Sequence, residues 1–189
     1  MAIHERRPAS IHLETEHLTL RPLPAEAAAA LPRDRAEAAR ILGAKLEPDW
    51  PLDDIAGNLR LQATAPPGDE LYGVWAVIER ETGLVVGEIG FEGHPAVGTV
   101  ETFFSVVPSR RRRGYASEAA RALVGWAFQQ PGVVHVHARC QPQNFASIAT
   151  LERAGFHLTR EDDGLLHWRA TNPTHPEPRH WWRAERGSR

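Results

Sequence analysis

The chain has only one cysteine, Cys140, so no disulfide can form within it. A lone thiol is typical of proteins in a reducing compartment, and we expect a cytoplasmic location. The chain also lacks an apolar run approaching the roughly 20 residues of a membrane-spanning helix. Its first residues are polar, unlike a signal peptide. We therefore expect no membrane partner.

A strong charge of either sign is missing too. The formal net charge is −2, which argues against a chain-wide attraction to nucleic acid and leaves only local clusters as anion sites. Hydrophobic residues make up 42% and charged residues 24% of the 189 residues, as in ordinary globular domains that bury their own core. We expect one domain over residues 11–170. Residues 1–10 are expected to be disordered or extended, and residues 171–189 to form a partly docked extension.

The apolar pattern changes its period along the chain. Alternation predicts strands over 11–23 (one bent strand or a pair), 72–79, 84–92, 99–107, 133–140, 156–160 and 165–169. Helical spacing predicts helices over 24–42 (one or two, interrupted near Pro32), from Asp53 to about residue 63, around 120–128 and over 144–154. This order predicts an α/β (α+β) domain with a mixed sheet and at least one parallel pair of strands.

The most informative segment runs from Val106 to Ala119, where a predicted strand leads through a basic turn directly into a helix. Amides at a helix start have no intrahelical partner, and the helix dipole adds about half a positive charge there. Such an end can hold a pyrophosphate. Gly114 lets the backbone approach a ligand closely, and Ala116 is small for the same reason.

The four arginines of this turn, Arg110–Arg113, add attraction for a polyanion. The spacing favours an anion site, and two alternatives stay open. One is a solvated basic turn. The other is a nucleic-acid patch, but the chain lacks the interleaved aromatic residues and the overall basicity typical of such patches. We expect no nucleic-acid partner.

Three segments together resemble one known family. Arg111-x-x-Gly114-x-Ala116 resembles the R/Q-x-x-G-x-G/A signature of the GNAT acetyltransferase superfamily. The run from Asn144 to Phe156 is similar to N-x-x-S-x-x-x-L-E-x-x-G-F of the branch that contains the RimJ/RimL-type ribosomal-protein N-acetyltransferases. The opening, Leu13–Pro22, resembles the first strand of that branch. The resemblance covers residues 11 to about 170 in the family's order. It implies a mostly antiparallel central sheet flanked by about four helices.

The resemblance further implies acetyl-CoA as co-substrate, bound where the fourth and fifth strands splay apart, and no metal. Backbone groups of Val106 and Val107 would pair with the pantetheine arm, and the Asn144 side chain would touch the coenzyme. The residues assigned to the coenzyme are Val106, Val107, Arg111, Arg112, Arg113, Gly114, Tyr115, Ala116, Ser117 and Asn144.

The family transfers acetyl directly to an amine, without a covalent enzyme intermediate. A lysine-like amine must first lose a proton at a cost of roughly 4–5 kcal/mol at pH 7, and an N-terminal amine at a cost of about 1 kcal/mol. Glu101 resembles the strand glutamate that serves as the base in some family members, and Glu88 is the second candidate. The alternative for Glu101 is an exposed strand residue without a catalytic role.

The departing thiolate also needs a proton. Many relatives supply it from a tyrosine seven residues after the asparagine, where this chain has Leu151. Ser147 stands where the RimL-like branch carries a serine proposed for that role. Its alternative role is to reinforce the helix cap of Asn144. Trp50, before the second helical region, is expected to line the acceptor pocket together with Glu88.

The leading prediction is therefore an acetyl-CoA-dependent N-acetyltransferase acting on a protein N-terminus or a small-molecule amine. The alternative is a catalytically silent acyl-CoA-binding module. His135 and His137 have a spacing that can ligate a metal, but no third ligand is near them in the sequence, so we expect a polar strand face. The tail carries Trp181 and Trp182, which can pack on a second subunit and form a homodimer.

Overall fold

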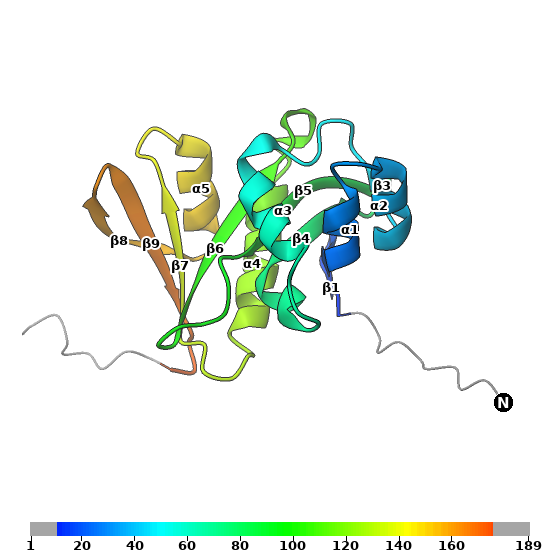
Figure 1. Cartoon of the computed structure of the whole chain (residues 1–189). Helices are drawn as coiled ribbons and strands as arrows, with labels where there is room; N and C mark the ends of the chain where they lie inside the picture. Colours follow the sequence, from blue (N-terminus) through cyan, green and yellow to red (C-terminus); the bar gives the residue numbers. More distant parts are fainter. Residues whose placement is uncertain (1–10, 176–189) are drawn as a thin grey trace, which may run out of the picture.

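The computed structural model describes residues 11–175, which form a nine-stranded sheet with helices on both faces (Figure 1). The strands are β1 (Leu13–Glu14), β2 (Leu18–Pro22), β3 (Lys45–Leu46), β4 (Val74–Glu79), β5 (Leu84–Phe91), β6 (Thr99–Val106), β7 (His135–Cys140), β8 (His157–Asp162) and β9 (Leu165–Thr171). The α-helices are α1 (Ala25–Ala30), α2 (Arg35–Leu42), α3 (Ala56–Gln62), α4 (Tyr115–Ala127) and α5 (Phe145–Arg153). Short 3₁₀ turns are η1 (Asp53–Ile55), η2 (Asp69–Tyr72) and η3 (Pro108–Arg110).

The strands lie in the order β1-β2-β4-β5-β6-β7-β9-β8, with β3 attached to the start of β5. All neighbours are antiparallel except β3–β5 and β6–β7, which are parallel. This confirms the predicted mixed, mostly antiparallel sheet with a parallel pair.

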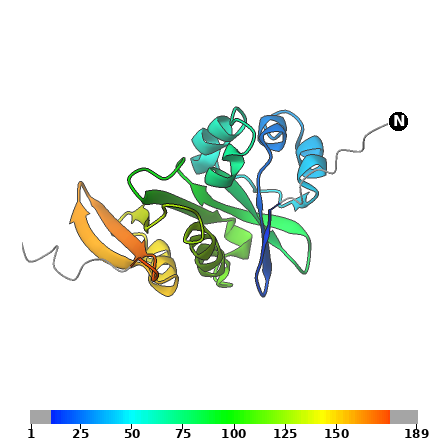
Figure 2. The same ribbon diagram turned by 90° about the horizontal axis from the view of Figure 1, so that it is seen from below.

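The sheet separates two apolar cores. The first is formed with α4 and α5, and its α4 residues recur at the expected helical spacing: Ala119, Ala120, Leu123, Val124, Trp126 and Ala127. The second is formed with α1, α2 and α3 around Trp50. Figure 2 shows these two groups of helices on opposite faces of the sheet. We call them the α4 face and the α1–α3 face.

Several element bounds differ from the sequence-based expectation. Tyr72 ends the 3₁₀ turn η2 and does not begin a strand. The strand β3 was not predicted, because two residues are too few to show an alternating pattern. The alanine-rich stretch forms two helices with a break around Pro32, in agreement with the prediction of one or two helices there, and the described chain has five α-helices. The expected helix at Asp53 begins as the 3₁₀ turn η1.

The end of the described chain is docked on the core. Asn172 is 2% exposed, and its amide group donates to the carbonyl oxygens of Phe128 at 3.0 Å and Val133 at 3.2 Å. Thr171, where the extension was expected to begin, is the last residue of β9. Residues 1–10 and 176–189, including Trp181 and Trp182, lie outside the described residues. Within 11–175, no helix has the length and apolar character needed to cross a membrane.

Candidate coenzyme and active site

The strands β6 and β7 pair only at their beginnings. Their ladder joins Thr99–Glu101 to His135–His137 and then stops, while both strands continue. The two strands therefore diverge beyond this ladder, as Figure 1 shows, and we call the region between their later parts, which the ladder does not join, the β6–β7 opening. This is the splay that the family resemblance implies.

Backbone groups of β6 face this opening. The Val107 N–H donates to Val86 O at 2.9 Å, so alternation along an antiparallel pair turns both backbone groups of Val106 away from β5 and toward the opening. The Val106 carbonyl accepts from Arg111 Nε at 2.9 Å. The Val107 carbonyl accepts from the Arg110 N–H at 3.0 Å, so both backbone groups of Val107 are bonded inside the protein. Of the two valines assigned to the coenzyme, only Val106 offers its backbone to the opening.

At the end of β6, the chain passes through η3 and an exposed segment into α4. Gly114 is the N-cap of α4 with a φ of +84°, and no side chain caps this helix. Among the described residues, the amides of Arg112 to Ser117 have no hydrogen-bond acceptor. A Cβ atom placed on Gly114 would meet nothing within 4 Å. The start of α4 is thus an open group of unpaired N–H donors at the positive end of a helix.

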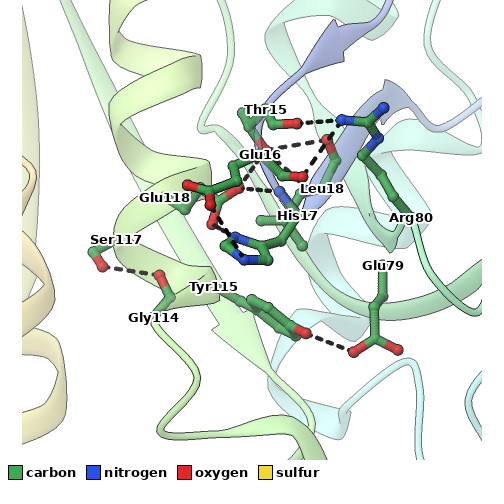
Figure 3. Close-up of polar contacts among 10 residues, drawn as sticks. All are labelled: Thr15, Glu16, His17, Leu18, Glu79, Arg80, Gly114, Tyr115, Ser117 and Glu118. Atoms are coloured by element: carbon green, nitrogen blue, oxygen red, sulfur yellow. Dashed lines mark hydrogen bonds and ion pairs between the residues drawn. The ribbon is translucent and has the colours of Figure 1, made fainter.

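The side chains around this segment divide into two groups. Arg112 and Arg113 are exposed. Tyr115 is buried and donates its hydroxyl to Glu79 at 2.6 Å, and Ser117 Oγ donates back to Gly114 O at 2.9 Å (Figure 3). Tyr115 and Ser117 therefore support the helix start with their side chains, while their amides remain available.

The first turn of α4 also anchors the β1–β2 turn. Glu118 accepts from the Thr15 hydroxyl at 2.6 Å, from the His17 N–H at 2.8 Å, and contacts His17 Nδ1 at 3.0 Å (Figure 3). A shallow hollow of about 370 Å³ lies beside these residues and is lined by Thr15, Glu16, Glu118, Arg121 and Ala122. No residue of β7 lines this hollow, so it is separate from the β6–β7 opening.

The α5 helix starts shortly after β7 ends. Asn144 is its N-cap, and its Oδ1 accepts from the Ser147 N–H at 3.0 Å. The predicted cap is confirmed, and Ser147 contributes to it through its amide and not through its hydroxyl. Leu151, which stands seven residues after Asn144, is 1% exposed and belongs to the core.

Glu88 and Trp50, which the sequence analysis assigned to the acceptor pocket, are in direct contact. Both side chains are fully buried on the α1–α3 face, and Trp50 Nε1 donates to Glu88 Oε2 at 2.5 Å. The Ser105 hydroxyl donates to the other carboxylate oxygen, Oε1. Burial raises the pKa of Glu88 to about 7, against the hydrogen bonds from Ser105 and Trp50, which lower it. Glu88 therefore gains or loses its proton near neutral pH.

Glu101 lies on the same face of β6 as Ser105. The β5–β6 register is unbroken from Thr102 to Val106, and the Glu92 N–H donates to Glu101 O at 2.9 Å, so no bulge changes the phase between Glu101, Phe103 and Ser105. The Glu101 side chain is 29% exposed and forms an ion pair with Arg139 of β7. Arg139 also reaches Glu92 at 3.6 Å. Glu101 is thus a charged group at the point where β6 and β7 begin to diverge.

Sequence reasoning did not find Ser105, Arg139 or Glu79. Ser105 was recognisable in part, since it is four residues from Glu101 on one strand and must share its face. The contacts of Glu79 and Arg139 depend on which strands are neighbours, and a single sequence does not state this.

The residues 11–175 contain no group of three or more side chains suited to hold a metal ion. His135 and His137 lie on one face of β7, and burial together with the nearby charge of Arg169 lowers the pKa of His137. Burial raises the pKa of the Cys140 thiol. A thiol with a raised pKa is a poor nucleophile at neutral pH.

Comparisons with known proteins agree with this geometry. Residues 17–157 match the family model described as an acetyltransferase (GNAT) domain. A Bacillus subtilis protein named uncharacterized N-acetyltransferase YjdG is 31% identical over 160 residues, which cover 82% of this chain and 95% of that protein.

Solved structures of acetyltransferases share the fold. The GNAT-family acetyltransferase from Bacillus anthracis has a TM-score of 0.60 at 19% identity, over 86% of this chain and 99% of that one. The ribosomal-protein-S5-alanine acetyltransferase from Vibrio fischeri has a TM-score of 0.60 at 16% identity, over 86% and 97%.

Proposed function

Since the chain belongs to the GNAT acetyltransferase family, we propose that it binds acetyl-CoA in the β6–β7 opening and transfers the acetyl group directly to a primary amine. The amine belongs to a protein N-terminus or to a small molecule. The observation that carries this proposal is the path from the inward-facing backbone of Val106 to the unpaired amides at the start of α4. Such a path suits a ligand with an amide-bearing arm and a diphosphate.

On this path the pantetheine amides would pair with Val106. The pyrophosphate would take the amides of Arg112 to Ala116, with the side chains of Arg111, Arg112 and Arg113 supplying positive charge. The Asn144 side chain would touch the coenzyme from the α5 side. No metal takes part in this scheme.

The transfer needs a base for the amine. The nitrogen forms a bond to the thioester carbon, the carbon–sulfur bond breaks, and the amine proton must leave. We assign that proton to Glu88, with Ser105 as the hydroxyl that connects the buried carboxylate to the acceptor. A base is most effective when its pKa lies near the working pH, and the pKa of Glu88 is about 7.

The sequence analysis named Glu101 as the first candidate for the base, and we propose a different role for it. Its carboxylate is held by Arg139, so we place this pair at the rim of the acceptor site, where it orients the incoming amine. Trp50 and Glu88 form the floor of the same site. The departing thiolate accepts a hydrogen bond from the Ser147 hydroxyl and takes its proton from solvent, through a water molecule that this hydroxyl orients.

A screen of amines tests the proposal. The full chain is incubated with acetyl-CoA and peptides with free N-termini, polyamines, amino acids and aminoglycosides, and release of the coenzyme thiol is followed. We expect thiol release above the amine-free rate for at least one acceptor, with intersecting initial-rate lines that indicate a ternary complex. Absence of coenzyme binding by calorimetry would reject the site. Binding without turnover of any amine would favour the silent module.

A further inference from the structure

One buried carboxylate, Glu79, contacts both ends of the segment 111–114, which leads into α4 and carries the first of the amides that we assign to the pyrophosphate. Glu79 is the last residue of β4 and is 2% exposed. Its Oε2 accepts from Arg110 Nη1 at 2.9 Å, just before the segment. Its Oε1 accepts from the Tyr115 hydroxyl at 2.6 Å, just after the segment, a contact visible in Figure 3. Residues 111–114 therefore run between two anchor points on a single side chain.

The carboxylate of Glu79 is itself firmly held. Thr82 Oγ1 donates to its Oε2 at 2.6 Å, and Arg110 extends the network to Glu47 Oε1 at 2.6 Å. Burial alone would raise the pKa of Glu79, but the hydrogen bonds from Thr82 and Tyr115 and the charges of Arg110 and Arg113 outweigh burial and lower the pKa. Glu79 is therefore ionised at neutral pH, and this charge keeps both anchors in place.

The segment between the anchors has an uncommon backbone. Arg112 has a φ of +62° and Gly114 a φ of +84°. A non-glycine residue keeps such a conformation only where its surroundings fix it. Arg111 is extended, with φ −69° and ψ 166°, so the backbone conformation changes between Arg111 and Arg112. Fixed ends thus set the arrangement of the amides in between.

We propose that Glu79 is a positioning residue of the coenzyme site, which holds Arg110 and Tyr115 so that the amides between them match a pyrophosphate. Glu79 does not touch the ligand in this scheme. The inference rests on the proposed function, because the segment matters in this way only if it binds the coenzyme.

If only the charge of Glu79 mattered, its removal would strengthen coenzyme binding, which is the opposite of what the positioning role predicts. Glu79 neutralises Arg110 and lies 3.3 Å from Arg113, so removal of its charge would increase the positive potential at the site. If charge alone governed affinity, Glu79→Gln would bind the coenzyme more tightly. If the two anchors govern affinity, Glu79→Gln would bind it more weakly.

Calorimetric titration of the full chain with coenzyme A distinguishes the two outcomes. We expect Glu79→Gln and Tyr115→Phe to raise the Kd at least about tenfold, equivalent to about 1.4 kcal/mol. The KM for acetyl-CoA should rise in the same proportion, while kcat at saturating acetyl-CoA stays within about twofold. Tyr115→Phe keeps the aromatic ring in the core, so it carries the test if Glu79→Gln does not fold.

A matched control is Gln62→Leu on α3. Gln62 is 3% exposed and joins Leu23 O at 2.6 Å to the Val74 N–H at 3.0 Å, on the α1–α3 face and without contact to the segment. We expect it to lose stability and to keep the wild-type Kd. Unchanged or tighter binding by Glu79→Gln and Tyr115→Phe, with a wild type that binds, overturns the inference and leaves the proposed function standing. A wild type that does not bind coenzyme A overturns both.

Discussion

Glu88 is the residue whose protonation is expected to control turnover. Because its pKa is raised to about 7, the carboxylate is protonated below that pH and becomes a base above it. We expect kcat/KM to rise with pH through about 7. In Glu88→Gln this step should be lost and the rate should fall by about a hundredfold, as is typical for removal of a general base. The measurement is a pH–rate profile between about pH 5.5 and 9.

Glu101→Gln is the matched variant for this profile. It removes a carboxylate from the same sheet face, so we expect a higher KM for the acceptor and an unchanged step near pH 7. A profile in which Glu101→Gln loses the step and Glu88→Gln keeps it would assign the base to Glu101.

The same ionisation links Glu88 to stability. Between its ordinary pKa near 4.5 and about 7, the folded chain keeps a proton that the unfolded chain has lost. The free energy of unfolding therefore falls as pH rises through this window. Above pH 7 the loss is about 3 kcal/mol. Chemical unfolding of Glu88→Gln at pH 8 should show a more stable chain than the wild type, which would separate its loss of turnover from a loss of folding.

Ser147 allows a clean substitution. The Asn144 cap accepts from the Ser147 amide, so Ser147→Ala keeps the cap while it removes the hydroxyl. We expect kcat to fall about tenfold with an unchanged Kd for coenzyme A, since the hydroxyl acts on the leaving thiolate. Turnover assays at saturating substrate concentrations give kcat, and calorimetric titration gives the Kd for coenzyme A. An unchanged kcat would leave Ser147 with its capping role alone.

At the scale of the elements, the start of α4 is where substitution should matter most. A Cβ atom at Gly114 would meet no protein atom within 4 Å, and the branched side chain of a valine would extend into the space assigned to the pyrophosphate. Its branched side chain also disfavours a φ of +84°. We expect Gly114→Val to weaken coenzyme binding by at least about a hundredfold, measured by calorimetry, and to lose about 1–3 kcal/mol of stability.

Gly164, in the β8–β9 turn, provides the control. It has a φ of +73° and likewise nothing within 4 Å of a Cβ atom. Gly164→Val therefore carries the same backbone strain away from the coenzyme site. Equal losses of affinity in both variants would mean that strain, and not the blocked ligand, causes the effect at Gly114.

The elements also show what the sequence determines. The start of α4 was recognisable because glycine, arginines and helical spacing occur within a few neighbouring residues. The Asn144 cap was recognisable for the same reason. The contact of Glu88 with Ser105 was not, because it depends on the β5–β6 register, which two strands of similar composition do not reveal. The hydrogen bonds that Arg110 and Tyr115 donate to Glu79 join residues more than 30 positions apart in the sequence. No local sequence pattern predicts them.

At the scale of the whole molecule, the sheet consists of two parts that are joined by a short ladder between β6 and β7. The ladder between strands β1–β6 and strands β7–β9 has three residue pairs, Thr99–Glu101 with His135–His137. On the α4 face, α4 and α5 also pack together across this connection. A coenzyme in the opening would contact both parts, through Val106 on one side and Asn144 on the other.

Coenzyme A should therefore stabilise both parts of the sheet together. At a concentration of about 100 times its Kd, a ligand adds about 2.7 kcal/mol to the free energy of unfolding. For a domain of this size each kcal/mol raises the Tm by roughly 2–4 °C. In hydrogen exchange we expect slower exchange at residues 102–106 of β6, at residues 138–140 of β7 and at the start of α5, and no such change in Gly114→Val. Protection limited to the start of α4 would mean that only the pyrophosphate end is bound, because a pantetheine arm lying between the strands must shield both of them.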